Sequence, residues 1–134
     1  MIMPNEKMFQ KYVMRKVPHG YRISLTTGGG FPDILLIHGE RHSLVELKML
    51  EIGPSGDKKI GGIFKASQPP WYMNYLANGG KRLFVLFHLN ERYGIVHVDR
   101  DFVMSIESMR YSDLPKFAYK EFDKLTDLIE EYFA

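Results

Sequence analysis

The chain contains no cysteine, which excludes disulfide bonds and thiolate metal sites. Any metal ion would be held by oxygen or imidazole ligands, and this favours magnesium or manganese over softer ions. No apolar stretch approaches the roughly 20 residues of a membrane-spanning helix. Charged side chains also interrupt residues 1–16 before a signal-like apolar segment can form. We therefore expect an intracellular protein with no membrane partner.

The sequence patterns of several enzyme classes are also missing. Three glycines stand at residues 28–30, but no Gly-Lys-Ser/Thr follows them and no helix is predicted after them, which excludes a P-loop. No two of the five histidines share the i, i+4 spacing of a zinc protease on one predicted helix. There is no Gly-x-Ser-x-Gly, so a serine hydrolase is disfavoured. We expect no organic cofactor.

Length and composition favour one globular domain over residues 1–134. The chain is 45% hydrophobic and 13% aromatic, which is enough for a full core. Its net charge of +2 is unevenly distributed. Residues 1–112 carry 15 basic and 10 acidic side chains, net +5, whereas residues 113–134 carry 3 and 6, net −3. A basic excess over most of the chain suits a nucleic-acid partner, although a mixed solvated surface explains it equally well.

The hydrophobic pattern predicts alternating helices and strands. Asn5 can cap a first helix, a second begins at Ser67 or Gln68 with prolines in its first turn, and a final amphipathic helix opens at Asp113. Residues 49–66 form a long glycine- and lysine-rich loop that we interpret as a substrate-contacting flap. The order α-β-β-β-α-β-β-α predicts an α/β fold with a central mixed β-sheet flanked by helices. The predicted strands are residues 21–26, 34–37, 44–47, 81–88 and 93–98.

The strands at residues 34–37 and 44–47 read as a β-hairpin. If Gly39 and Glu40 form its loop, paired residues have numbers that sum to 79, and Asp33 lies directly opposite Glu46. Lys48 shares their face because side chains alternate with a period of two. A three-residue loop would shift the register by one and separate the carboxylates.

Two opposed carboxylates repel each other by up to ~1 kcal/mol relative to a neutral pair. A shared divalent cation offsets this repulsion, because Cβ atoms roughly 5 Å apart let both carboxylates reach one ion. The pattern therefore points to a metal site. The alternative is that Asp33 ends a turn while Glu46 and Lys48 form an ordinary surface ion pair.

The spacing of these residues resembles the PD-(D/E)XK nuclease superfamily. Pro32-Asp33 is followed after twelve residues by Glu46-Leu47-Lys48. The strings Gly-Phe-Pro-Asp, Val-Glu-Leu-Lys and Ser-Gln-Pro-Pro-Trp look like the VRR-NUC and Holliday junction resolvase-like branches, and the resemblance covers residues 6–89. The chain departs from this pattern in its longer loop between Lys48 and Gln68, which leaves the substrate geometry open.

The resemblance implies a restriction endonuclease-like core and a metal-dependent DNA endonuclease that is selective for branched or junction DNA. Mg²⁺, or Mn²⁺ in its place, would be held by Asp33, Glu46 and the backbone carbonyl of Leu47. Lys48 would orient the attacking water or the developing negative charge, and Gln68 would support the site. An acidic residue on the first helix often adds a ligand in this family, so Glu6 is a candidate. Small members of this fold pair two active sites, which implies a homodimer.

Basic side chains on the first helix and in the long loop are candidate phosphate contacts, and a solvated face is the alternative for each. Trp71 is interpreted as core in preference to a base-stacking platform. Aromatic residues near the last helix, Tyr111, Phe117 and Tyr119, are candidates for a dimer contact or for closing the core. A catalytically silent nucleic-acid-binding or complex-assembly module is the alternative function. The candidate phosphate contacts are Lys7, Lys11, Arg15, Lys58, Lys59 and Lys65.

Overall fold

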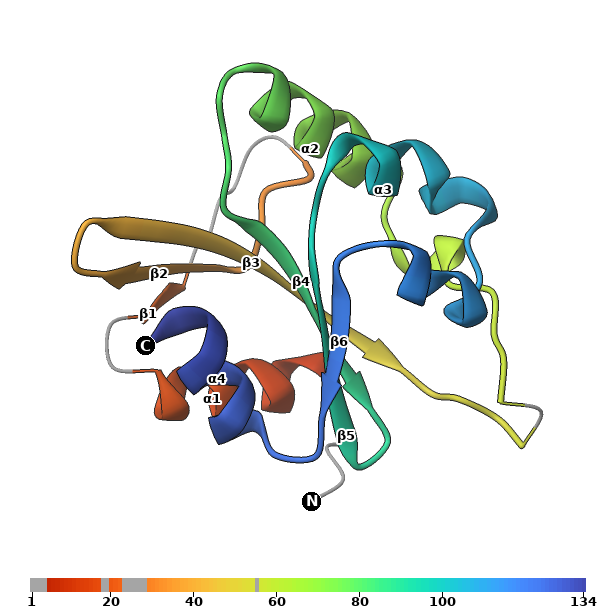
Figure 1. Cartoon of the computed structure of the whole chain (residues 1–134), viewed down its shortest axis with the longest axis horizontal. Helices are drawn as coiled ribbons and strands as arrows, with labels where there is room; N and C mark the ends of the chain where they lie inside the picture. Colours follow the sequence, from red (N-terminus) through yellow and green to blue (C-terminus); the bar gives the residue numbers. More distant parts are fainter. Residues whose placement is uncertain (1–4, 18–19, 23–28, 55) are drawn as a thin grey trace.

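A computed structural model describes residues 5–17, 20–22, 29–54 and 56–134. It shows an α/β fold built on one six-stranded mixed sheet whose strands lie side by side in chain order (Figure 1). Only the β3–β4 pair is parallel among the paired strands of the described residues, and the other neighbours are antiparallel. The strands are β1 (Gly20–Arg22), β2 (Ile34–His38), β3 (Arg41–Leu50), β4 (Leu83–Leu89), β5 (Arg92–His97) and β6 (Tyr119–Phe122).

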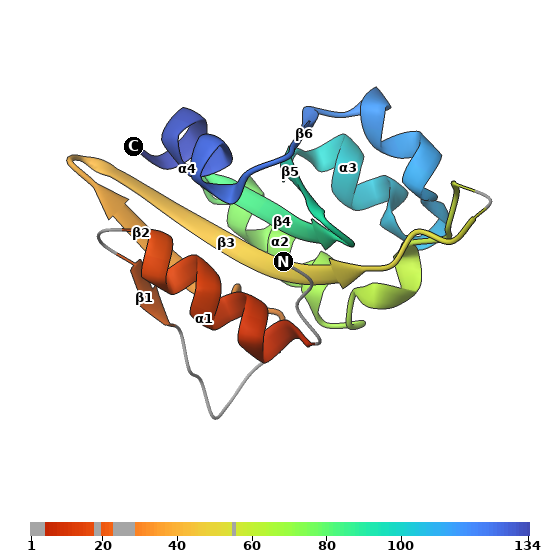
Figure 2. The same cartoon turned by 90° about the horizontal axis from the view of Figure 1, so that it is seen from below.

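The predicted hairpin is confirmed in β2 and β3. Ile34 pairs with Val45 and His38 with Arg41, so the residue numbers of each pair sum to 79. Gly39 has φ +60° and Glu40 is not in the positive-φ region, which fits a two-residue loop with glycine in its first central position. The strand β3 continues to Leu50, three residues beyond its predicted end, and is the longest strand of the sheet (Figure 2).

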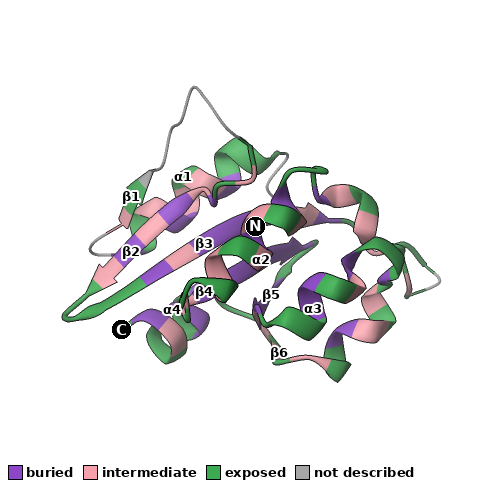
Figure 3. Cartoon of the chain, turned by 90° about the horizontal axis from the view of Figure 1, so that it is seen from above, coloured by how far each residue is buried: buried purple, intermediate pink, exposed green. Residues whose placement is uncertain are grey.

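Helices cover both faces of the sheet. The helices α1 (Glu6–Lys16) and α4 (Leu125–Phe133) pack with one set of sheet residues, and α2 (Gln68–Ala77) and α3 (Arg100–Ser105) pack with the set that points the other way (Figure 1). Every residue of the central strand β4 is buried between these layers, as its continuous apolar run predicts (Figure 3). The parallel β3–β4 pair needs a crossover, and α2 lies within it.

Local signals account for where several helices begin. The Asn5 side chain accepts a hydrogen bond from the Met8 amide at 2.9 Å and caps α1, as predicted. Asp99 caps α3 in the same way through the Phe102 amide at 2.8 Å. The prolines that follow Gln68 occupy the first turn of α2, where a missing N–H costs little.

The C-terminal third differs from the prediction. No helix opens at Asp113; residues Tyr111–Lys116 form a 3₁₀ helix, β6 follows as an edge strand, and α4 begins only at Leu125. The element order therefore contains a strand, β6, that the predicted order lacks, and residues 99–109, which the sequence left open as a short helix, contain α3. In the short strand β6 two charged residues lie between Tyr119 and Phe122, and this spacing of three also fits one turn of an amphipathic helix. The predicted first strand begins in β1, and its residues 23–26 lie outside the described part of the chain.

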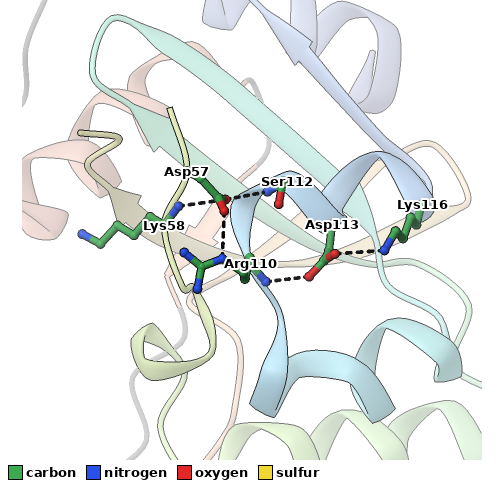
Figure 4. A network of polar contacts seen from close by, with 6 residues as sticks. All are labelled: Asp57, Lys58, Arg110, Ser112, Asp113 and Lys116. Atoms are coloured by element: carbon green, nitrogen blue, oxygen red, sulfur yellow. Dashed lines mark hydrogen bonds and ion pairs between the residues drawn. The ribbon is translucent and has the colours of Figure 1, made fainter. Parts of the chain in front are cut away.

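The predicted flap is tied to the body of the protein at its C-terminal end. The Tyr111 amide donates to the Lys58 carbonyl at 2.6 Å, and the Ile60 amide donates to Met109 at 2.9 Å. Asp57 accepts hydrogen bonds from the Arg110 guanidinium at 2.8 Å and from the Ser112 amide at 3.1 Å (Figure 4). The 3₁₀ helix of residues Gly61–Ile63 then leads toward α2. Residues 57–60 are therefore hydrogen-bonded to residues 109–112, and contact of this loop with a substrate stays a prediction.

Aromatic side chains near the last helix are used within the fold. Phe117 packs on the core cluster beneath α2 and α3, and Tyr111 and Tyr119 donate hydrogen bonds to Glu121 at 2.5 and 2.6 Å. These contacts agree with the interpretation that the three residues help to close the core, and the dimer contact stays a prediction. None of the helices in the described ranges combines the length and apolar character needed to cross a membrane.

Candidate functional site

Three carboxylates from distant parts of the chain meet at the start of β2. Glu6 comes from the first turn of α1, Asp33 directly precedes β2, and Glu46 lies in β3. Each offers one oxygen, and these oxygens all lie within 4.8 Å of one another. The predicted pair is therefore joined by the candidate residue from the first helix.

The position of Asp33 follows from the hairpin. Its amide donates to the Val45 carbonyl at 3.1 Å, one step beyond the last paired residue of β2. Its side-chain Oδ2 accepts a hydrogen bond from the Leu47 amide at 2.8 Å. The carboxylate is therefore fixed between the strands by backbone groups, and its other oxygen, Oδ1, is not used in this bond.

Glu46 is a buried carboxylate with one oxygen left over. The residue is 2% exposed, on the face of β3 that α2 covers. Its Oε2 accepts a hydrogen bond from Gln68 Nε2 at 2.9 Å, whereas Oε1 has no hydrogen-bond partner among the described residues. A buried carboxylate oxygen without a partner is costly, so the fold retains an acceptor that its own side chains do not satisfy.

Gln68 links the other polar groups of the site. Its Oε1 accepts hydrogen bonds from Lys48 Nζ and from the Lys65 amide, each at 2.9 Å. The Lys48 ammonium also lies 3.3 Å from Glu46 Oε2 and 5.2 Å from the centre of the Phe64 ring. Lys48 and Gln68 are both buried, so their positions are fixed by these contacts and not by solvent.

The electrostatics of the cluster raise the pKa values of Glu46 and Glu6. Burial, followed by the charge of Asp33, raises the pKa of Glu46 to about 8, despite the opposing effects of Lys48 and Gln68. Burial and Asp33 also raise the pKa of Glu6, and Lys48 and Lys65 lower it less. The Lys48–Glu46 contact therefore does not compensate for the desolvation of Glu46 and its repulsion by Asp33.

The cluster opens into a cavity of about 310 Å³. Its wall is mostly polar, and it includes Gly29 and Gly30, part of the glycine triplet that precedes Asp33. These glycines lie against the start of α2, since a Cβ on Gly30 would come within 2.3 Å of the Ser67 carbonyl oxygen. The other lining residues are Glu6, Phe31, Pro32, Asp33, Glu46, Lys48, Ile63, Lys65, Ser67 and Gln68.

The candidate phosphate contacts fall into three groups. Lys65 lines the cavity itself. Lys7, Lys11 and Arg15 are exposed on α1 at intervals of four residues, so they form a stripe that begins beside Glu6. Lys58 and Lys59 are exposed in the anchored loop and do not line the cavity. The structure thus brings Lys65 to the site. Of the α1 stripe, only Lys7 adjoins a site residue, Glu6, along the chain, and the loop pair does not line the cavity.

Two aromatic residues at the site were not among the sequence candidates. Tyr72 is fully buried one helical turn after Gln68, and its hydroxyl has no hydrogen-bond partner within the described part of the chain. Phe31 lines the cavity with 43% of its surface exposed. The i, i+4 spacing from Gln68 and the position two residues before Asp33 are the sequence signals that could have indicated them.

Comparison with known proteins adds no assignment. No protein-family model and no curated protein sequence matches this chain. The functional reading depends on the residues of the site and on the resemblance of their spacing to the PD-(D/E)XK pattern.

Proposed function

We propose that the chain is a metal-dependent DNA endonuclease of the PD-(D/E)XK type, selective for branched or junction DNA. One observation carries this proposal: Glu46, buried beside Asp33, keeps one carboxylate oxygen without a partner. A repulsive, partly unsatisfied pair of carboxylates has no stabilising role in a metal-free protein. A basic side chain and an amide, Lys48 and Gln68, stand in contact with the same carboxylate.

The residues fit a hard divalent cation. Carboxylate oxygens are the ligands that Mg²⁺ and Mn²⁺ prefer, and Asp33 and Glu46 supply them, with Glu6 as an additional ligand and the Leu47 carbonyl as the predicted backbone one. When bound, Mg²⁺ would lower the pKa of a coordinated water and offset negative charge on the scissile phosphate.

The remaining side chains have roles that follow from their contacts. The Lys48 ammonium is held by Gln68, so it can donate a hydrogen bond to the attacking water or to a phosphate oxygen without first being ordered. Gln68 accepts a hydrogen bond from the Lys65 amide, and its contacts with Glu46 and Lys48 hold these two side chains next to each other. Lys65, at the cavity wall, adds positive charge where a phosphate would enter.

The test is a cleavage panel. Labelled junction, flap, nicked, duplex and RNA substrates are incubated with Mg²⁺, Mn²⁺ or EDTA. We expect cleavage of branched DNA with either metal and none in EDTA. Asp33→Asn and Glu46→Gln should each reduce the rate to the EDTA background while the protein stays folded, because each amide keeps the size of the acid it replaces and Glu46→Gln mimics the protonated side chain that burial favours.

Lys48→Ala tests the role of the Lys48 ammonium separately from the binding of Mg²⁺. We expect a rate loss of about 10²–10³-fold, as for loss of one stabilising donor, with Mg²⁺ affinity by calorimetry almost unchanged. Parental rates for Asp33→Asn or Glu46→Gln in Mg²⁺ would contradict the metal assignment. Binding of branched DNA without cleavage in any metal would favour the alternative, a catalytically silent nucleic-acid-binding module.

A further inference from the structure

Three aromatic rings form a row that starts at the wall of the cavity. The Phe31 and Trp71 ring centres are 4.7 Å apart, and Trp71 stacks on Tyr75 at 5.3 Å with an angle of 12° between the rings. Trp71 and Tyr75 are half-buried, while 43% of the Phe31 surface is exposed. The row is therefore open to solvent at Phe31, the ring nearest to the carboxylates in sequence.

The row is closed at its other end. A Cβ added to Gly80 would come within 2.2 Å of the Tyr75 ring, so the backbone at Gly80 lies directly against it. The sequence interpretation of Trp71 as core describes its contacts with α2 neighbours and Tyr75. Core packing of Trp71 does not explain why Phe31, which is itself exposed, packs against it.

Phe31 is held in place by its neighbours. Gly30 has φ +89°, and a Cβ there would come within 2.7 Å of the Trp71 Cβ, so this part of the backbone is pressed against α2. Pro32, on the other side, is buried, and the Asp33 amide is bonded to Val45. An exposed aromatic ring on a fixed backbone loses little freedom when a ligand stacks on it.

The position of Phe31 indicates what it could stack on. It lines the same cavity as Asp33 and Glu46, together with Lys65. A phosphate bound at the carboxylates would carry a base within reach of a ring two residues along the chain from Asp33. Aromatic rings stack on any nucleobase, because every base has a π-face. In a continuous duplex both faces of a base are covered by its neighbours, so only an unstacked base can meet the ring.

We infer that Phe31, supported by Trp71 and Tyr75, stacks on an unpaired base next to the phosphate at the carboxylate cluster. The inference rests on the proposed function and narrows its substrate class to strands with an unstacked nucleotide at the cut, such as flaps, single-stranded ends and open branch points. DNA and RNA share this chemistry, and the experiment separates them.

The experiment measures binding and not cleavage, with Ca²⁺ as a hard cation for oxygen ligands that can lie between the carboxylates and a phosphate, and with EDTA as the metal-free comparison. Trp71 is the only tryptophan and reports directly on the row through its fluorescence. A short single strand should bind and quench the fluorescence of Trp71, whereas the same strand in a blunt duplex should bind weakly and quench little. The comparison of DNA with RNA strands then shows which sugar-phosphate backbone the site accepts. Phe31→Ala should weaken single-strand binding by about 5- to 150-fold, the range for loss of one base–aromatic stack, and leave duplex binding almost unchanged.

Met104→Ala is the matched control, because Met104 is a large apolar side chain, 75% exposed, on α3. It should bind like the parent, and both variants should melt at parental temperatures. Equal single-strand affinity for Phe31→Ala and the parent, equal quenching by duplex, or no binding of any strand would each overturn the inference. Quenching that depends on Phe31 without cleavage in Mg²⁺ would support the stacking site and contradict the nuclease.

Discussion

Glu46 controls the charge balance of the candidate site. It lies under α2, beside Asp33, with Lys48 and Gln68 in contact with one oxygen and nothing in the described chain bonded to the other. Burial outweighs the nearby ammonium, so the pKa of Glu46 rises to about 8. A metal ion would reverse this balance, because a carboxylate must lose its proton before it ligates.

The raised pKa predicts a pH dependence of stability in the metal-free protein. Glu46 changes from its ordinary pKa of 4.5 when unfolded to about 8 when folded. The folded state therefore holds a proton that the unfolded state has released, and the free energy of unfolding falls as pH rises through this window. The contribution is fully present below pH 4.5 and is lost as pH passes about 8, with a total on the order of a few kcal/mol.

Urea unfolding in EDTA at a series of pH values measures this effect. Glu46→Gln mimics the protonated side chain and should lack this pH dependence, whereas Glu40→Gln, an exposed change at the hairpin loop, should follow the parent. Mg²⁺ affinity of the parent should rise over the same pH range. An identical pH profile for Glu46→Gln and the parent would show that Glu46 is not the titrating group.

At the scale of elements, the hydrogen bonds that hold residues 57–60 against residues 109–112 can be tested without a ligand. Hydrogen bonds from the Arg110 side chain and the Ser112 amide hold the pKa of Asp57 down at about 2, so it stays ionised at ordinary pH (Figure 4). Asp57→Ala should speed amide exchange at Lys58 and Ser112, the two amides that it accepts from. Hydrogen-exchange mass spectrometry measures this change in the peptides that cover residues 51–60 and 109–116.

Lys116→Ala is the control, because Lys116 pairs with Asp113 in the same network but does not contact the loop. It should leave exchange in residues 51–60 unchanged. Parental exchange in Asp57→Ala would mean that the backbone bonds from Tyr111 and Ile60 hold the loop without Asp57.

We expect the basic stripe on α1 to contribute to nucleic-acid binding and the loop pair, Lys58 and Lys59, not to contribute. Each phosphate contact contributes a slope of roughly −0.9 to the dependence of log affinity on log salt. Replacing Lys7, Lys11 and Arg15 by alanine should flatten that slope by up to about 3 for branched DNA, because the stripe begins beside Glu6. Lys58→Ala with Lys59→Ala should leave the slope unchanged. A flatter slope for the Lys58 and Lys59 variant, with an unchanged slope for the α1 variant, would favour the interpretation of the loop as a DNA-contacting flap.

For the whole molecule, pairing of two copies stays a prediction. Cutting two strands in concert needs two sites, and a C₂ dimer needs a self-complementary surface. Tyr111, Phe117 and Tyr119 make contacts within the chain but stay half-buried, so they remain candidates for that surface. We expect a dimer on junction DNA in sedimentation at micromolar protein. A monomer that stays monomeric on the junction would contradict junction resolution and favour nicking or flap cleavage.

Local rules were enough to predict part of this protein. The two-residue turn at Gly39 and Glu40 sets the register, and alternation along β3 then places Glu46 and Lys48 on one face. The Asn5 cap and the prolines at the start of α2 are likewise signals within a few residues of what they determine. The α/β class and the mixed sheet follow from the order of such segments.

Tertiary structure alone decided the environment of these residues. Glu46 is deeply buried and its pKa raised because α2, more than 20 residues further along, packs over β3. The approach of Glu6, the exposure of Phe31 on Trp71 and the anchoring of Asp57 by Arg110 also join distant segments. Sequence periodicity records which face of an element is apolar, but the partner of that face is set by the packing of the whole chain. For the same reason β6, whose pattern suits a helix or an edge strand, took its form from pairing with β5.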